Sequence, residues 1–378
     1  MSNNGQNNDE RSDNQAVPIE PYTALGISTT VRSIIKRDEI QRNLDHIANI
    51  IHGAMWFNMQ FPIRLVTLAE AALTGFTDQA FNIDHETAAR EMFIEIPGKE
   101  TDYMADLAKH YHIYLIFQCK ARWPEVIENR FFNTALIIDP SGKIIHKYAK
   151  NHLFPREHST TPHDVWDRWV EIFGDGLESF WPVAKTEIGN IGTLICNDGA
   201  YFEASRALAL NGAELIYRPN FTIPFVCNGV FELQNRAHAM FNNCYVIGPN
   251  TGPNYVAPWV HEPFDSTQGH GHIVDYMGQI ISRSISGANT VVSGTIDIEQ
   301  LRKFRHTALW GNWLKDMRTE LFHRVYEKPI LPKNIALDQP PPKHKEYDEI
   351  LRKTIQLLED RNIYTPPAQK PRLITTYH

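Results

Sequence analysis

The chain has 378 residues, of which 42% are hydrophobic and 21% are charged, as in globular proteins with one large core or two smaller ones. Its net charge of −7 and scattered basic residues argue against nucleic acid, so a small molecule is the expected partner. Its apolar runs fall well short of the roughly 20 residues that cross a bilayer, and the polar N-terminus has no apolar signal region. The sequence therefore predicts a cytoplasmic protein without membrane contact.

The N-terminal segment is expected to be a disordered tail over residues 1–21, because its Asn, Asp, Ser and Gln residues offer almost nothing to bury. The body that follows alternates apolar strands with amphipathic helices. The expected strands cover residues 23–31, 63–68, 113–117, 134–138, 143–148, 213–217 and 244–248, with a hairpin at 272–281. The expected helices cover residues 40–51, 104–111, 204–210 and 231–241.

Two further hairpins are predicted from turn residues. The first turns at Asp139–Gly142, and the second uses Gly189 and Asn190 as its tight turn before it reaches Cys196. Hairpins make antiparallel neighbours, whereas the passage over 191–217 allows parallel ones. The pattern by itself therefore predicts a mixed-sheet α/β or α+β fold.

The C-terminal part changes character after about His306, where tryptophans and basic residues mix with prolines. We expect residues 22–309 to form the main domain and 310–378 an extended arm. The arm ends in an amphipathic helix with Ile350, Leu351, Ile355 and Leu358 on one stripe. That stripe is expected to bury itself against the body or a neighbouring subunit.

The cysteines are four in number, Cys119, Cys196, Cys227 and Cys244, and none forms a C-x-x-C pair. This spacing suits neither a disulfide framework nor a zinc knuckle, so each is expected to be a free thiol. Cys196 follows an apolar strand and precedes a helix, which can form an elbow that exposes a nucleophile. Taken alone, a small buried thiol is the commoner fate of such a cysteine.

Two charged residues also end apolar strands. Glu70 closes the segment 63–70, where a carboxylate among aliphatic residues is costly unless it is paired or has a raised pKa. Lys150 ends the strand before His152-Leu-Phe154. Each of these two residues could instead be an ordinary solvated residue on the surface. Because Glu70, Lys150 and Cys196 all lie at strand ends, however, a shared site is favoured.

These three segments together resemble the signature blocks of the nitrilase superfamily of carbon–nitrogen hydrolases. The blocks are Ala69-Glu70-x-x-Leu-Thr-Gly75, Lys147-Tyr-x-Lys150-x-His-Leu-Phe154 and Ile195-Cys-Asn-Asp198, the last followed by Gly212-Ala-Glu-Leu-Ile216. The resemblance covers about residues 22–305 in the correct order. It implies a four-layer α-β-β-α sandwich and usually a dimer or larger homo-oligomer, with no metal or organic cofactor.

The resemblance also implies roles for individual residues. Cys196 is then the nucleophile, Glu70 the general base, and Lys150 the cation that stabilises the oxyanion together with the backbone N–H of Asn197. Glu157 is the nearest candidate for the second active-site glutamate of the family. Arg218 and Asn220 are expected to line the substrate pocket, although a structural pairing of Arg218 with a carboxylate stays open.

The residues after the nucleophile bear on the reaction. Nitrile-cleaving members usually carry Cys-Trp-Glu, whereas this chain has Cys196-Asn-Asp198 and continues with Gly199. This favours hydrolysis of a linear, non-peptide amide, with an N-carbamoyl substrate as the alternative and a nitrile after that. Two rivals of other classes are a metal hydrolase, built on His110-x-His112 or His270-Gly-His272, and a scaffold without activity.

Overall fold

The computed structural model describes residues 17–155, 157–223, 226, 228–287 and 289–369. Most of the predicted tail lies outside these residues, as does Cys227. Two six-stranded sheets form the centre of the described body. The first runs in the order β14 (Thr290–Ile296), β1 (Tyr22–Ser28), β3 (Ile63–Leu68), β4 (Tyr114–Arg122), β5 (Phe131–Ile138), β6 (Ile144–Ala149). The second runs β13 (Ile280–Arg283), β12 (His272–Val274), β10 (Tyr245–Gly248), β9 (Leu215–Tyr217), β8 (Gly189–Thr193), β7 (Val183–Thr186).

Both sheets share one pairing plan. The inner strands β1, β3 and β4 are parallel, as are β8, β9 and β10, and antiparallel strands pair on both sides of each set. A short pair, β2 (Val31–Arg32) with β11 (Asn254–Tyr255), lies apart from the large sheets. Because parallel strands end at the same edge, this plan gathers the residues that follow them.

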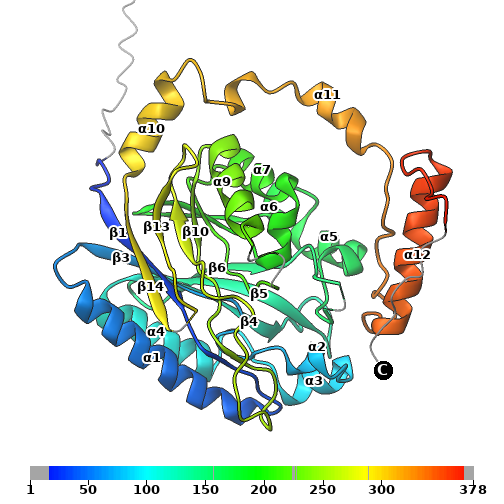
Figure 1. Cartoon of the computed structure of the whole chain (residues 1–378), viewed down its shortest axis with the longest axis horizontal. Helices are drawn as coiled ribbons and strands as arrows, with labels where there is room; N and C mark the ends of the chain where they lie inside the picture. Colours follow the sequence, from blue (N-terminus) through cyan, green and yellow to red (C-terminus); the bar gives the residue numbers. More distant parts are fainter. Residues whose placement is uncertain (1–16, 156, 224–225, 227, 288, 370–378) are drawn as a thin grey trace, which may run out of the picture.

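Helices cover the outer face of each sheet (Figure 1). On the first sheet these are α1 (Ile40–Phe57) and α4 (Lys99–Tyr111), and on the second α7 (Phe202–Leu210) and α9 (Val230–Asn242). Shorter helices lie at the sheet ends and connections: α2 (Thr77–Ala80), α3 (His85–Glu91), α5 (Trp166–Phe173), α6 (Leu177–Phe180) and α10 (Ile298–Thr307). The predicted α-β-β-α sandwich is confirmed.

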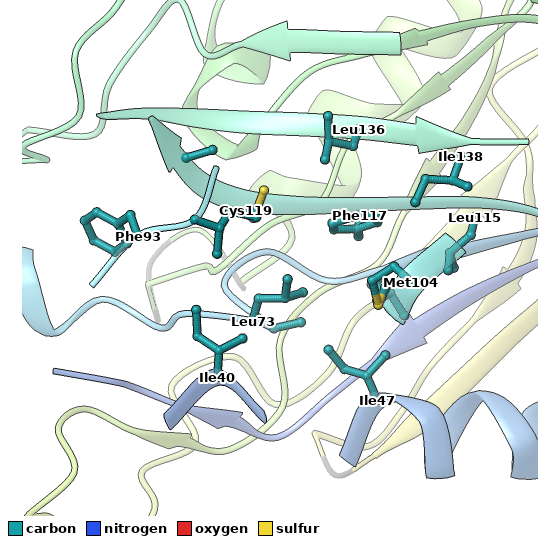
Figure 2. Close-up of a cluster of buried hydrophobic side chains, with 14 of the residues drawn as sticks. Ile40, Ile47, Leu73, Phe93, Met104, Leu115, Phe117, Cys119, Leu136 and Ile138 are labelled. Atoms are coloured by element: carbon teal, nitrogen blue, oxygen red, sulfur yellow. The ribbon is translucent and has the colours of Figure 1, made fainter. Parts of the chain in front are cut away.

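Three apolar cores separate the four layers, and alternation along each strand divides its side chains between them. In β4, Leu115 and Phe117 point to the helical core, where Figure 2 shows them near Ile47 of α1 and Met104 of α4. Ile116 faces the core between the sheets instead. A third core lies under α7 and α9. The two sheets are thereby fixed against each other below the strand ends.

The second predicted hairpin turns elsewhere than expected. Thr186 pairs with Gly189, so the turn consists of Glu187 and Ile188, and the prediction of Gly189 and Asn190 is wrong. The Thr186 hydroxyl accepts a hydrogen bond from the Ile188 N–H and donates one to the Gly189 carbonyl. Gly189 has a φ of +112°, a conformation that only glycine adopts readily. A glycine at this position is therefore as compatible with the residue that follows the turn as with a residue inside it.

The C-terminal arm leaves α10 and runs around the outside of the body through α11 (Thr319–His323) to α12 (His344–Asp360) (Figure 1). It is tied to the body by backbone hydrogen bonds from Asn334 and Ala336 to the carbonyls of His163 and Asp164. Within this single chain the stripe on α12 is unevenly covered, and its burial against a neighbouring subunit stays a prediction. Leu358 is buried, but Leu351 is 41% exposed.

Candidate active site

Cys196 lies on a sharp elbow two residues after Leu194, where the chain leaves β8 and enters the 3-10 helix Cys196–Ala200. Its φ is +50°, a left-handed conformation that is strained for a residue with a side chain. Its N–H donates to the Pro219 carbonyl at 2.9 Å, which ties the elbow to the end of β9. The strained turn presents the thiol at the edge where the parallel strands end.

Glu70 follows β3 and meets Cys196 across the two sheets. The carboxyl group is 1% exposed, and the nearby Cys196 thiol is among the groups that affect its pKa. It also accepts hydrogen bonds from the Phe221 N–H at 3.0 Å and from the Asn133 amide at 3.3 Å. Just below, the Tyr217 hydroxyl donates to the Leu68 carbonyl at 2.6 Å and so couples β9 to β3.

Lys150 follows β6 and brings in a second carboxylate. Its ammonium lies 2.6 Å from Glu157 Oε2 and 3.6 Å from Glu70 Oε1, and all three side chains are about 1% exposed. Glu157 is held further by the Asn133 amide at 2.9 Å, the Ser159 hydroxyl at 3.1 Å and the Phe154 N–H at 3.2 Å. The structure thus joins the buried side chains of Glu70, Lys150 and Glu157 in one network next to the half-buried Cys196.

The environment gives the two glutamates different proton affinities. Burial raises the pKa of Glu70, and the nearby Lys150 only partly opposes this. Burial also disfavours the charge of Glu157, but Lys150 and Lys120 overcome it and hold the pKa of Glu157 below its usual value. Two carboxyl groups with pKa values pushed apart suit a division between a proton acceptor and a fixed anion.

The cation and the thiol are shifted as well. Burial would lower the pKa of Lys150, yet Glu157 and Glu70 raise it above its usual value, so the ammonium stays charged. Burial and the Glu70 charge raise the pKa of the Cys196 thiol. The resting thiol is therefore protonated, and a reaction at its sulfur needs a base at contact distance.

Asp198 organises the loop that carries Lys150. Its carboxylate accepts hydrogen bonds from the Tyr148 hydroxyl at 2.7 Å, from the Ile195 N–H at 2.9 Å and from the His152 N–H at 2.8 Å. These donors lie on both sides of Lys150 and just before Cys196. One buried carboxylate therefore sets the distance between the lysine loop and the nucleophile elbow.

The other predicted site residues lie around this network. Asn197 follows the nucleophile, and its side-chain amide donates to the Leu153 carbonyl at 2.7 Å. Asn220 is buried and forms a bridge with Asn250 directly before Phe221. Asn197 directly follows Cys196 in the chain, and Asn220 directly precedes Phe221, whose N–H binds Glu70.

Arg218 supports the elbow from behind. Its guanidinium donates two hydrogen bonds to the Cys196 carbonyl, at 3.0 and 3.2 Å, and one each to the side-chain oxygens of Gln234 and Asn235. These acceptors are a carbonyl and two amides, so the carboxylate partner considered for Arg218 is not among them. A substrate contact of Arg218 stays a prediction.

Asn133 and Gln118 belong to the site but were not singled out from the sequence. The Gln118 amide donates to Asn133 Oδ1 at 2.5 Å, and its carbonyl accepts from the Ala71 N–H at 2.7 Å. Asn133 in turn donates to both glutamates. The available signal was polarity, because each amide lies within a strand that is mostly apolar and almost entirely buried.

The histidine pairs that could have indicated a metal hydrolase do not converge. Within the described ranges, no group of three His, Cys, Asp or Glu side chains is arranged to hold a metal ion. In the second pair, the ring nitrogens of His272 face the Asn235 amide and the His270 carbonyl, each at 2.8 Å. Among these same residues no helix is long and apolar enough to cross a membrane.

Comparisons with known proteins agree with the architecture. Residues 28–306 match the carbon-nitrogen hydrolase family, a range that falls inside the predicted domain at 22–309. The chain is 28% identical over 228 residues to an omega-amidase NIT2-B from Xenopus laevis, which covers 60% of this chain and 77% of that protein.

Solved structures agree in fold. A carbon-nitrogen hydrolase from Helicobacter pylori has a TM-score of 0.60 at 19% identity, over 82% of this chain and 99% of that one. A variant amidase from Nesterenkonia sp. AN1, with the acetamide moiety of fluoroacetamide added covalently at its active-site cysteine, has a TM-score of 0.56 at 17% identity, over 80% and 96%. This chain belongs to the carbon–nitrogen hydrolase family.

Proposed function

We propose that the protein hydrolyses a linear, non-peptide amide to a carboxylic acid and ammonia through a thioester on Cys196. The observation that carries this proposal is the buried Lys150 between Glu70 and Glu157, next to the Cys196 thiol. A nucleophile, a base with a raised pKa and a fixed cation are the groups that acyl transfer requires. The omega-amidase and the Nesterenkonia amidase provide related examples in amide chemistry.

The first half of the proposed reaction forms the acyl-enzyme. Glu70 takes the proton from the Cys196 sulfur, and the thiolate adds to the amide carbon. The oxygen then carries a negative charge, which Lys150 and the backbone N–H of Asn197 stabilise. Glu70 returns the proton to nitrogen, the C–N bond breaks, and ammonia leaves with Cys196 bound as a thioester.

The second half restores the enzyme. Glu70 takes a proton from water while the hydroxide adds to the thioester carbon. The C–S bond breaks, the carboxylic acid is released, and the sulfur regains its proton. Glu157 stays ionised throughout in this scheme, because its task is to hold the Lys150 ammonium in place.

An ammonia-release screen distinguishes amides from the alternative substrates. Short aliphatic amides, formamide, N-carbamoyl amino acids and nitriles are offered to the wild type and to the Cys196→Ala variant. We expect ammonia from amides in the wild type alone. Ammonia only from N-carbamoyl compounds or only from nitriles contradicts the proposed substrate class, and an unchanged rate in Cys196→Ala contradicts the mechanism.

We also propose that the enzyme is a cytoplasmic homo-oligomer. The outer helices of the second sheet expose large apolar side chains, with Phe202 63%, Leu233 67% and Phe241 48% exposed. Such residues favour association of subunits when they form a continuous patch. Light scattering coupled to size-exclusion chromatography measures the mass, and a monomer at micromolar concentration contradicts this proposal.

A further inference from the structure

His85 lies outside the catalytic network and has a hydrogen-bond partner at each ring nitrogen. It is the first residue of α3 and is 5% exposed. Its Nδ1 lies 2.7 Å from the His158 carbonyl oxygen, and its Nε2 lies 3.4 Å from the backbone nitrogen of Phe131. A carbonyl only accepts and a backbone N–H only donates, so the ring carries one proton, on Nδ1. Burial lowers the pKa of His85 to about 3, which keeps the ring neutral at neutral pH.

The ring of His85 also packs on the first residue of β5. It stacks on the ring of Phe131, with centroids 4.3 Å apart and an angle of 15° between the planes. Phe131 is fully buried, and two residues further along β5 the Asn133 amide donates to both Glu70 and Glu157. The same imidazole therefore contacts the strand that carries the shared amide.

The His158 carbonyl belongs to the segment that carries the second glutamate of the network. Glu157 directly precedes His158. The segment continues along the start of β5, where the Thr160 N–H donates to the carbonyl of the first strand residue at 2.9 Å. His85 thus joins this segment to β5 from a third element, α3.

We propose that His85 is a positioning residue for the reaction, because it holds the backbone beside Glu157 so that this carboxylate keeps its contact with the Lys150 ammonium. The His158 carbonyl is buried, and without the imidazole donor it would have to move toward another donor or stay unsatisfied, which is costly. A movement of this backbone displaces Glu157, whose Oε2 lies 2.6 Å from Lys150 Nζ. The inference rests on the proposed function, in which Glu157 holds the cation that stabilises the oxyanion.

The test compares kcat per folded molecule of full-length variants with that of the wild type. His85→Phe keeps a stacking ring but removes the donor, and it should lower kcat about tenfold or more with a smaller change in KM, because misplaced catalytic groups cost up to about 10²-fold. His85→Asn keeps an amide donor close to the place of Nδ1 and should recover most of this loss.

Glu86→Gln is the matched control. Glu86 follows His85 in α3, and its carboxylate pairs at 3.0 Å with Arg130, the residue before β5. The variant therefore loosens the same two elements without removing the donor to the His158 carbonyl. It should stay within about twofold of the wild type, since the pair is half exposed.

A double variant decides whether His85 acts through Glu157. If it does, His85→Phe should lower kcat by less than about twofold further in Glu157→Gln, because the charge that it positions is already absent. Multiplied losses in the double variant overturn this role. Wild-type kcat in His85→Phe, or an equal loss in Glu86→Gln, overturns it as well.

A structural readout does not depend on amide hydrolysis. In crystal structures of the wild type and His85→Phe, the distance from Lys150 Nζ to Glu157 Oε2 should increase in the variant beyond the hydrogen-bond limit of about 3.2 Å. An unchanged contact overturns the role of His85. Absence of amide hydrolysis in the wild type contradicts the proposed function instead, and the two crystal structures still decide whether His85 positions Glu157.

Discussion

Lys120 and Lys150 are two buried lysines of the first sheet that differ in the groups around their ammonium ions. Lys120, on β4, is 0% exposed and has both Asp78 oxygens at 2.5 and 2.7 Å, with the rings of Phe76 and Phe93 within 5.4 Å. Lys150, after β6, is equally buried but faces two carboxylates, one at 2.6 Å and one at 3.6 Å. Among the described residues, Lys120 forms an ion pair with Asp78 alone and affects Glu157 only through its charge, whereas Lys150 lies next to both glutamates.

The difference lies in what remains available for chemistry. In the Lys120 pair one cation matches one anion, and aromatic faces surround the cation. In the Lys150 network the second carboxylate, Glu70, is shared with a protonated thiol. Removing a member of the pair should therefore act on stability, whereas removing a member of the network should act on the reaction.

The largest effect is expected from Cys196→Ala. Loss of the nucleophile should lower kcat/KM for the best amide by about 10⁴-fold or more. Cys119→Ala is the matched control, because Cys119 is a buried free thiol in the helical core. That variant should stay within about threefold of the wild type per folded molecule, since it lies outside the reacting groups. Comparable losses of kcat/KM in both variants would contradict the distinction between Cys119 as a thiol of the apolar core and Cys196 as the nucleophile.

Glu70→Gln should follow, with a loss of about 10²–10⁴-fold in kcat, the usual contribution of a general base. Protonation of Glu70 removes the base, so wild-type activity should fall as pH drops through the raised Glu70 pKa, above the ordinary value of about 4.3. The residual activity of Glu70→Gln should lack this acid limb. A pH profile of kcat/KM that is the same for both proteins contradicts this role.

The lysines themselves provide the direct contrast. Lys150→Met should reduce kcat by about 10²–10³-fold, as loss of an oxyanion partner does. Lys120→Met should lower the free energy of unfolding by about 3–5 kcal/mol, because it leaves Asp78 as an uncompensated buried charge. Urea denaturation and rates per folded molecule separate the two effects.

The double change Lys120→Met with Asp78→Leu sharpens this contrast. It removes both charges, so most of the lost stability should return. If the double variant instead loses activity per folded molecule to the extent of Lys150→Met, then the Lys120 pair belongs to the catalytic machinery.

Glu157→Gln should be milder, lowering kcat by about 10²-fold through misplacement of Lys150. The KM should change less than kcat, because the neutral amide still fills the same space. Steady-state kinetics check this separation. A rise in KM at constant kcat contradicts a role for Glu157 in holding the cation and indicates substrate binding instead.

Arg218→Lys is expected to have the smallest effect, about tenfold on kcat, because lysine cannot bond the Cys196 carbonyl and two amides at once. Arg236→Lys, on the exposed side of α9, is the control. Thermal unfolding and kinetics are measured together. Should Arg218→Lys raise KM without changing kcat, the expected substrate contact of Arg218 is favoured over support of the elbow.

Much of this arrangement could be predicted because its residues interrupt a pattern. Glu70, Lys150 and Cys196 each end an apolar strand, and strand ends of parallel sheets meet at one edge. Asn133 lies inside a strand and not at its end, so only its polarity within a buried strand could have indicated it. The partners of Arg218 depend on contacts between distant segments, which local periodicity does not encode.

The thioester on Cys196 is tested most directly by quenching the enzyme with acid during turnover of its best amide and measuring the intact mass. The account predicts a protein heavier by the acyl group, with the increment on the Cys196 peptide and absent from Cys196→Ala. An unmodified Cys196 peptide under quench conditions that preserve a chemically prepared thioester, together with hydrolysis that continues in Cys196→Ala, would contradict it.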